Sequence, residues 1–165
     1  MTAKTMSGSP HKRITMERVF DASIEDVWAM WTTREGIESW WGPDGFAVKV
    51  RSIDLRPGGE LRYAMIAVDP DKVEFMKRSG MPISVDTRIT FIEVLENRRL
   101  RYVNHADFIP GVEPYDVETV VELYPTAKGV RLELTFEAMH DEMWTQRAVA
   151  GWEMELRKLE KALAA

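Results

Sequence analysis

The sequence predicts an α+β fold in which an antiparallel sheet packs against one long helix. Three observations predict it. Apolar and polar residues alternate with a period of two in strand-like segments of the region 46–136, short turns join several of these segments, and residues 141–163 carry an apolar stripe with helical spacing. Tight turns join antiparallel neighbours, so we expect antiparallel pairing. A chain of 165 residues suits one domain with a stable core.

The beginning of the chain predicts a tail and then a strand. Residues 1–12 are mostly small and polar, so we expect a flexible N-terminal tail. The single domain is expected over residues 13–165, with its first strand at 13–20.

Two short helices are expected after this strand. Ser23 is a typical N-cap, with Asp26 as its capping-box partner. Thr33 can cap a second short helix that ends near residue 40 or 41, because Gly42 and Pro43 follow. The first helix places four apolar residues on one face, namely Ile24, Val27, Trp28 and Trp31.

The middle of the chain predicts the other strands. Asp69 and Pro70 interrupt the strand pattern and indicate a short helix before Gly80. This insertion over residues 69–82 is either a decorated connection between two strands or a lid over a pocket. The expected strands are 46–53, 60–67, 84–95, 100–105, 115–124 and 130–136.

One long helix is expected from Asp141, a typical N-cap, to Leu163. Gly151 is a poor helix former, and its place beside Trp152 indicates close approach to the sheet or to a ligand. The apolar stripe of this helix consists of Trp144, Ala148, Trp152, Leu156, Leu159 and Leu163.

Composition excludes several classes of function. A net charge of −5 without a basic stripe argues against binding to nucleic acid. The chain has no cysteine, and no run of 18 apolar residues or signal-like segment, so we expect a cytoplasmic protein without a membrane span. Two separated histidines, His105 and His140, with scattered carboxylates do not make a metal site, and no cofactor motif is present.

Four motifs in order resemble a known family. They are the Val27-Trp28 helix, Trp40-Trp41-Gly42-Pro43, Leu55-Arg56-Pro57-Gly58-Gly59, and Gly151-Trp152 followed by Leu156 and Leu159. The chain thereby resembles the activator of heat-shock-protein-90 ATPase C-terminal-domain family of the START-like (SRPBCC) superfamily. The resemblance implies a helix-grip fold, with a curved six- to seven-stranded sheet around the terminal helix and a hydrophobic cavity between them.

Aromatic residues and methionines are the candidates for lining such a cavity, because they give an apolar and adaptable wall. His105 is also the best candidate for a catalytic base, with Asp107 two residues away. The expected lining is Trp40, Trp41, Tyr63, Met65, Tyr102, His105, Phe108, Met143, Trp144 and Ala148.

We therefore expect a protein that binds a small apolar molecule without detectable catalysis. Two alternatives remain open: a protein-interaction module with a chaperone partner, as the family resemblance implies, and an enzyme acting on a polyketide-like molecule. A homodimer is also plausible, because small domains of this class expose strand edges.

Overall fold

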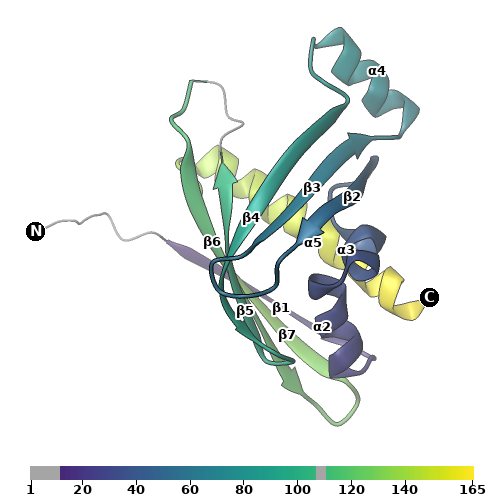
Figure 1. Cartoon of the computed structure of the whole chain (residues 1–165), viewed down its shortest axis with the longest axis vertical. Helices are drawn as coiled ribbons and strands as arrows, with labels where there is room; N and C mark the ends of the chain where they lie inside the picture. Colours follow the sequence, from purple (N-terminus) through teal and green to yellow (C-terminus); the bar gives the residue numbers. More distant parts are fainter. Residues whose placement is uncertain (1–11, 107–110) are drawn as a thin grey trace, which may run out of the picture.

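The computed structural model describes residues 12–106 and 111–165, which form one sheet and four helices (Figure 1). The strands are β1 (Arg13–Phe20), β2 (Phe46–Ile53), β3 (Glu60–Ala67), β4 (Ser84–Leu95), β5 (Arg99–Ala106), β6 (Tyr115–Pro125) and β7 (Val130–Glu137). The helices are α2 (Ile24–Thr32), α3 (Arg34–Trp40), α4 (Pro70–Arg78) and α5 (Glu142–Ala164). The predicted α+β fold with an antiparallel sheet is confirmed.

The seven strands lie in the order β1-β7-β6-β5-β4-β3-β2, and every neighbouring pair is antiparallel. Consecutive strands from β2 to β7 are therefore neighbours, while β1 joins the far edge beside β7. The register shifts between Val50 and Ser52 and between Phe91 and Glu93. Such irregularities bend and twist strands, which helps the sheet to curve.

Helices α2 and α3 carry the chain from one edge of the sheet to the other. The Ser23 hydroxyl accepts a hydrogen bond from the Asp26 N–H at 3.0 Å, and the Thr33 hydroxyl accepts one from the Gly36 N–H at 3.0 Å. These caps satisfy backbone donors that would otherwise lack partners at the helix starts. Helix α4 connects β3 to β4 and projects beyond the sheet (Figure 1).

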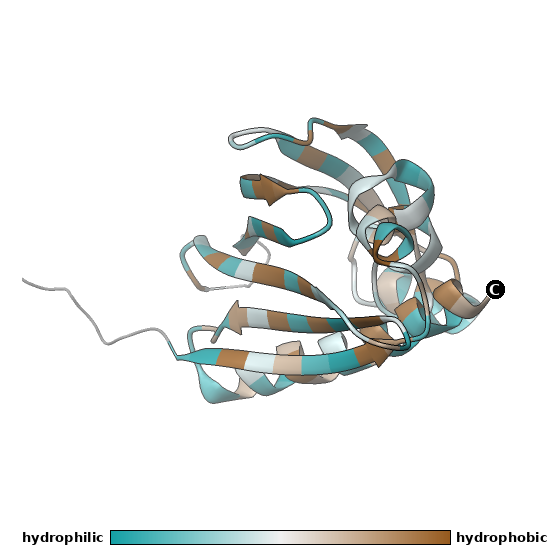
Figure 2. Cartoon of the chain, turned by 90° about the horizontal axis from the view of Figure 1, so that it is seen from below, coloured by the Kyte–Doolittle hydropathy of each residue, from teal (hydrophilic) through white to brown (hydrophobic). Residues whose placement is uncertain are grey.

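The inner face of the sheet, which we define as the face toward α5, carries the core. Side chains alternate along β7, so that Val130, Leu132, Leu134 and Phe136 are buried while the residues between them are partly exposed. Figure 2 shows this alternation of hydropathy along the strands. The period of two in the sequence therefore identifies the inner face correctly.

Helix α5 has two halves with different roles. In its C-terminal half, Leu156 and Leu159 are 1% and 0% exposed and belong to the core. In its N-terminal half, Trp144, Ala148 and Trp152 are only half-buried. In the described parts of the chain, no helix is long and apolar enough to cross a membrane.

Candidate functional site

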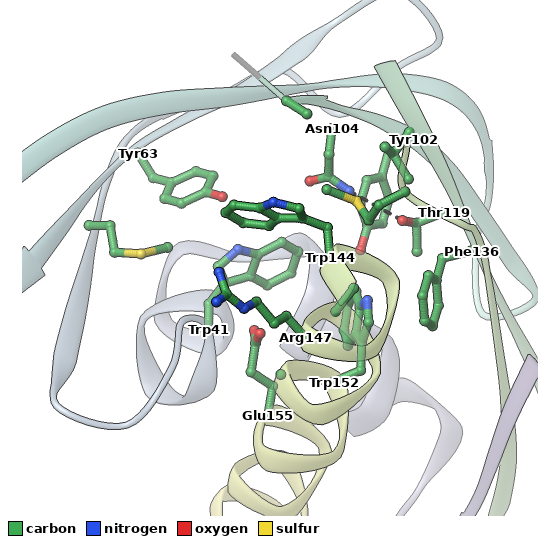
Figure 3. A pocket seen from close by; sticks show the side chains of 16 residues that line it. Trp41, Tyr63, Tyr102, Asn104, Thr119, Phe136, Trp144, Arg147, Trp152 and Glu155 are labelled. Carbon is green, nitrogen blue, oxygen red and sulfur yellow. Dashed lines mark hydrogen bonds between the residues drawn. The ribbon is translucent and has the colours of Figure 1, made fainter. Parts of the chain in front are cut away.

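The N-terminal half of α5 and the inner face of the sheet enclose a pocket of about 360 Å³. We call this the inner pocket (Figure 3). The backbone of α5 lies closer to α2 and α3 than to the strands, and the pocket lies between the N-terminal half of α5 and the sheet. The lining consists of Trp41, Tyr63, Met65, Tyr102, Asn104, Ala106, Val117, Thr119, Phe136, Met139, Trp144, Arg147, Ala148, Gly151, Trp152 and Glu155.

A row of aromatic rings connects the core to the inner pocket. Trp31 and Trp40 pack edge to face with centroids 4.6 Å apart, and Trp41 follows 5.3 Å from Trp40. Trp41 in turn lies 6.2 Å from both Tyr63 and Tyr102, measured between ring centroids. These separations are typical of favourable aromatic pairs. Trp41 thereby contacts rings on both sides, is buried and forms part of the pocket wall.

The polar groups of the inner pocket are few. Asn104 donates a hydrogen bond from Nδ2 to the Thr119 hydroxyl at 3.2 Å. Burial raises the pKa of Tyr63 to about 12, and it raises the pKa of Tyr102 further, so both phenols are neutral at physiological pH. The Tyr102 hydroxyl is fully buried and has no hydrogen-bond partner among the described residues.

Glu155 is the acidic group of the inner pocket. Its Oε1 accepts a hydrogen bond from the backbone N–H of Gly42 at 3.2 Å. Burial raises the pKa of Glu155 to about 7, although the Gly42 hydrogen bond and the Lys158 charge oppose this rise. Near neutral pH this carboxyl group therefore exists in both forms, so it can donate as well as accept a proton.

Gly42 occupies the turn between α3 and β2, and its conformation explains its identity. Its φ of +93° is one that residues with a Cβ rarely adopt, and an added Cβ would lie 3.1 Å from Val48 Cγ2. Lys158 also donates to the Gly42 carbonyl at 2.7 Å, so side chains of α5 bind both the N–H and the carbonyl of this residue. The turn that follows Trp41 is thus tied directly to the helix.

Several residues that the sequence predicted for a cavity come together here. Trp41, Tyr63, Met65, Tyr102, Trp144 and Ala148 line the inner pocket. They belong to the end of α3, two separate strands and α5. Figure 3 shows the labelled members of this group around one space.

Trp40 and Met143 do not line the inner pocket, which corrects their predicted placement. Trp40 is 1% exposed, packs on Trp31 and donates from Nε1 to the Met30 carbonyl at 2.8 Å. Met143 is 55% exposed in the first turn of α5. Successive residues of a helix are rotated by about 100° around its axis, so Met143 points in a different direction from its neighbour Trp144, which does line the pocket. Phe108 lies outside the described residues.

His105 was predicted to line the cavity, but it lies on the outer face of the sheet and lines the second hollow described below instead of the inner pocket. Nδ1 of His105 is 2.8 Å from Asp116 Oδ1, and Nε2 is 3.0 Å from the Thr90 hydroxyl. Successive strand residues point to opposite faces, which separates position 105 from 102 and 104. In the part of the chain that is described, no group of three or more His, Asp or Glu side chains is arranged to hold a metal ion.

A second hollow, of about 370 Å³, lies beside the inner pocket where β4 and β5 separate. Pairing of these strands begins at Ile89 with Asn104, although β4 starts at Ser84. The hollow shares Tyr63, Met65 and Asn104 with the inner pocket. From the insertion at 69–82, Met76 reaches this hollow, but no residue of the insertion lines the inner pocket.

Sequence reasoning missed several lining residues whose positions carry a detectable signal. Glu155 follows Ala148 by seven and Trp152 by three, so it lies at the edge of the apolar stripe, where a carboxylate is unexpected. Asn104 and Thr119 are polar residues on the buried face of their strands, each two positions from a buried residue on either side. Phe136 and Arg147 were also missed. Gly151 was expected to approach the sheet or a ligand closely, yet a Cβ added there meets no atom of the described residues within 4 Å.

Comparison with known proteins identifies the family. The model of the family described as activator of Hsp90 ATPase homolog 1-like protein matches residues 21–164. The chain belongs to this family. The START-like resemblance predicted from the four motifs is therefore confirmed.

Solved structures share the fold of this Hsp90-ATPase-activator-like chain. A crystal structure of a Chromobacterium violaceum protein is 25% identical with a TM-score of 0.75, covering 93% of this chain and 97% of that one. An AHSA1-like protein from Aeromonas hydrophila, solved in solution, is 22% identical in sequence with a TM-score of 0.71; the match covers 93% of this chain and 92% of that one. None of the curated proteins compared with the chain matches it.

Proposed function

We propose that this member of the Hsp90-ATPase-activator-like family binds a small apolar molecule in the inner pocket. The observation that carries the proposal is the division of α5. Its C-terminal half seals the core with Leu156 and Leu159, while its N-terminal half faces a pocket of about 360 Å³. This volume lies within the range of roughly 300–1,000 Å³ that is typical of ligand pockets.

The wall of the inner pocket has the composition that an apolar ligand requires. Aromatic rings from α3, the sheet and α5 supply most of it, and Met65 and Met139 add adaptable side chains. A few polar groups stand among them, which is typical of sites that orient an apolar ligand. Arg147 lies at the solvent-exposed rim, with its guanidinium 4.9 Å from the centroid of the Trp144 ring.

Gly151 offers a direct test of this proposal. Because Gly151 lines the inner pocket and nothing lies within 4 Å of a Cβ built at this position, a larger side chain here should occupy part of the pocket. The test uses the neutral fluorescent probe N-phenyl-1-naphthylamine, titrated into the wild-type protein and the Gly151→Leu variant. We expect saturable binding to the wild type and at least about tenfold weaker binding to the variant, a difference of about 1.4 kcal/mol.

The matched control is Ala150→Leu, which places the same side chain one residue earlier on α5, at an exposed position. We expect this variant to bind the probe as the wild type does. Equal binding by Gly151→Leu and the wild type, with the fold retained by circular dichroism, would show that the probe binds elsewhere and would refute the proposal.

A second candidate function is interaction with a partner protein through α4. No residue of α4 is buried, and Phe75 in α4 and Met81 just after it are 46% and 42% exposed. Exposed apolar residues that project from a domain are typical of protein-interaction sites. The family description makes the Hsp90 chaperone the partner to test. Purified Hsp90 should bind the wild type more strongly than the Phe75→Ser variant, and equal or absent binding would remove this candidate.

A further inference from the structure

The hydroxyl groups of Tyr102 and Tyr63 give the inner pocket a specific chemistry. Both side chains lie on the inner face, from β5 and β3 respectively, and both line the pocket. Tyr102 is 0% exposed, and its hydroxyl has no hydrogen-bond partner among the described residues. A buried polar group without a partner is rare in folded proteins and calls for an explanation. A ligand atom that completes the hydrogen bond is such an explanation.

The surroundings of Tyr102 indicate that its hydroxyl serves as a donor. The Trp31 indole N–H, which itself makes no hydrogen bond of ordinary geometry with the described residues, and the Thr119 hydroxyl both lie close enough to the phenol oxygen to lower the pKa of Tyr102, although the effect of burial is larger. Thr119 accepts from Asn104 Nδ2, which leaves its own proton free to turn toward Tyr102. The proton of the Tyr102 hydroxyl is then the part that lacks a partner.

Tyr63 repeats this arrangement from the other side of Trp41. The Trp41 ring lies 6.2 Å from the Tyr63 ring and lowers the pKa of the Tyr63 hydroxyl, although burial outweighs this effect. The Tyr63 phenol raises the pKa of Tyr102, and the charge of Glu155 raises the pKa of both phenols. The two hydroxyls and the Glu155 carboxyl group therefore share one region of the pocket (Figure 3).

This region favours a neutral acceptor over an anionic one. The carboxylate form of Glu155 would repel a second negative charge, whereas a neutral oxygen with lone pairs meets two phenol donors. The rings around this region, among them Trp41, Phe136 and Trp152, suit a flat molecule. Phe136 and Trp152 lie 6.3 Å apart between ring centroids with 34° between their planes.

We propose that the ligand of the inner pocket is a flat apolar molecule with a neutral carbonyl oxygen, which accepts hydrogen bonds from Tyr102 and Tyr63. This inference rests on the proposed function and specifies the class of its ligand. The apolar body lies against the aromatic wall, and the carbonyl oxygen points toward the sheet. The partnerless Tyr102 hydroxyl thereby gains its acceptor.

The test compares two probes of nearly equal shape, 1-tetralone and tetralin, of which only the first has a carbonyl group. Their affinities are measured by calorimetric titration for the wild type, Tyr102→Phe and Tyr63→Phe. We expect the wild type to prefer 1-tetralone by about tenfold, as one or two net hydrogen bonds provide. Tyr102→Phe should lose most of this preference, and Tyr63→Phe part of it. Tyr124→Phe is the control, because Tyr124 lies outside the pocket and packs on Arg131.

Infrared spectroscopy provides a readout that does not depend on affinity. The carbonyl band of bound 1-tetralone should lie at lower wavenumber in the wild type than in Tyr102→Phe, because donation to the oxygen weakens the C=O bond. If Tyr102→Phe fails to fold, the same comparison is made between the wild type and Tyr63→Phe: a lower wavenumber for the carbonyl band in the wild type supports the hydrogen bond, and an equal one contradicts it.

Each other outcome has a distinct meaning. Equal binding of both probes, or a preference that persists in both tyrosine variants, overturns the carbonyl inference and leaves the proposed function standing. Tighter binding of tetralin-1-carboxylate than of 1-tetralone, lost in Arg147→Gln, overturns it in favour of an anionic ligand at the rim. Absence of saturable binding for all three probes, together with failure of the Gly151→Leu experiment, overturns the proposed function itself.

Discussion

Glu155 of helix α5 accepts a hydrogen bond from the backbone N–H of Gly42, a residue 113 positions earlier in the chain. Lys158, one turn further along the helix, donates to the carbonyl of the same glycine at 2.7 Å. These two contacts fix the distance between α5 and the turn that follows Trp41. The pocket wall and the helix that closes it are thus held by a short polar connection.

The raised pKa of Glu155 predicts that stability depends on pH. Burial favours the neutral acid in the folded state, where the pKa is about 7 instead of the ordinary 4.5. The stabilisation is therefore complete below pH 4.5 and is lost as the pH rises to about 7, with a total change on the order of 3 kcal/mol. The groups that act on this carboxyl group are Lys158, which lowers its pKa, and the Gly42 N–H.

Urea unfolding at pH 5 and pH 7.5 measures this effect, with Glu155→Gln as the comparison. The amide keeps the size of the side chain and its acceptor but does not titrate. We expect the wild type to lose more stability than the variant over this interval. An equal loss in both proteins would mean that Glu155 titrates normally in the folded state.

The partnerless hydroxyl of Tyr102 predicts that its removal stabilises the ligand-free protein. A buried polar group without a partner costs about 1–3 kcal/mol. Tyr102→Phe keeps the ring and deletes only the hydroxyl, so its thermal unfolding midpoint should rise. Tyr124→Phe on the outer face should change stability by less than about 0.5 kcal/mol. A lower midpoint for Tyr102→Phe would mean that the hydroxyl already has a partner within the protein.

The space beside Gly151 predicts a second stabilising substitution. Alanine is a better helix former than glycine by up to about 1 kcal/mol, and the added methyl group meets open space. Gly151→Ala should therefore raise the free energy of unfolding, and the exposed Ala150→Gly should lower it by a similar amount. Loss of stability in Gly151→Ala would place the sheet against the helix at this point, contrary to the geometry of the inner pocket.

The different burial of Trp40 and Met143 predicts that replacing each by alanine will change the free energy of unfolding by very different amounts. Trp40 is buried among other rings, so Trp40→Ala should lower the free energy of unfolding by about 3–5 kcal/mol. The exposed Met143 should change it by less than about 0.5 kcal/mol when replaced by alanine. Urea unfolding of both variants tests this contrast, and comparable losses would contradict the placement of the two residues.

Most of the fold follows from local patterns in the sequence. Asp141 caps α5 as expected, with its carboxylate accepting from the Trp144 N–H at 2.8 Å, because capping depends on neighbouring residues alone. The period of two also places Tyr63 and Met65 on one face of β3. The expected end of β5 was short by one residue, since the strand extends to Ala106. Such boundaries depend on pairing with β6, which lies outside the local pattern.

The site itself was only partly predictable. Their aromatic side chains indicated Trp41 and Tyr102 as lining residues. Trp40 and Met143 were included because they adjoin Trp41 and Trp144 in the sequence, and only the packing shows that they lie outside the pocket. His105 could have been assigned to the outer face from its odd spacing to Tyr102. The contact between Glu155 and Gly42 joins distant segments, and neither residue signals it alone.

The most direct test of the central claim uses NMR of protein labelled with 13C at the methionine methyl groups. Met65 and Met139 line the inner pocket, whereas Met81 and Met143 are exposed to solvent and Met16 is buried in the core. On titration with tetralin, we predict saturable shifts for Met65 and Met139, and little change at Met16, Met81 and Met143. Unchanged signals from Met65 and Met139 at saturating probe, or larger shifts at Met81 and Met143, would contradict the account.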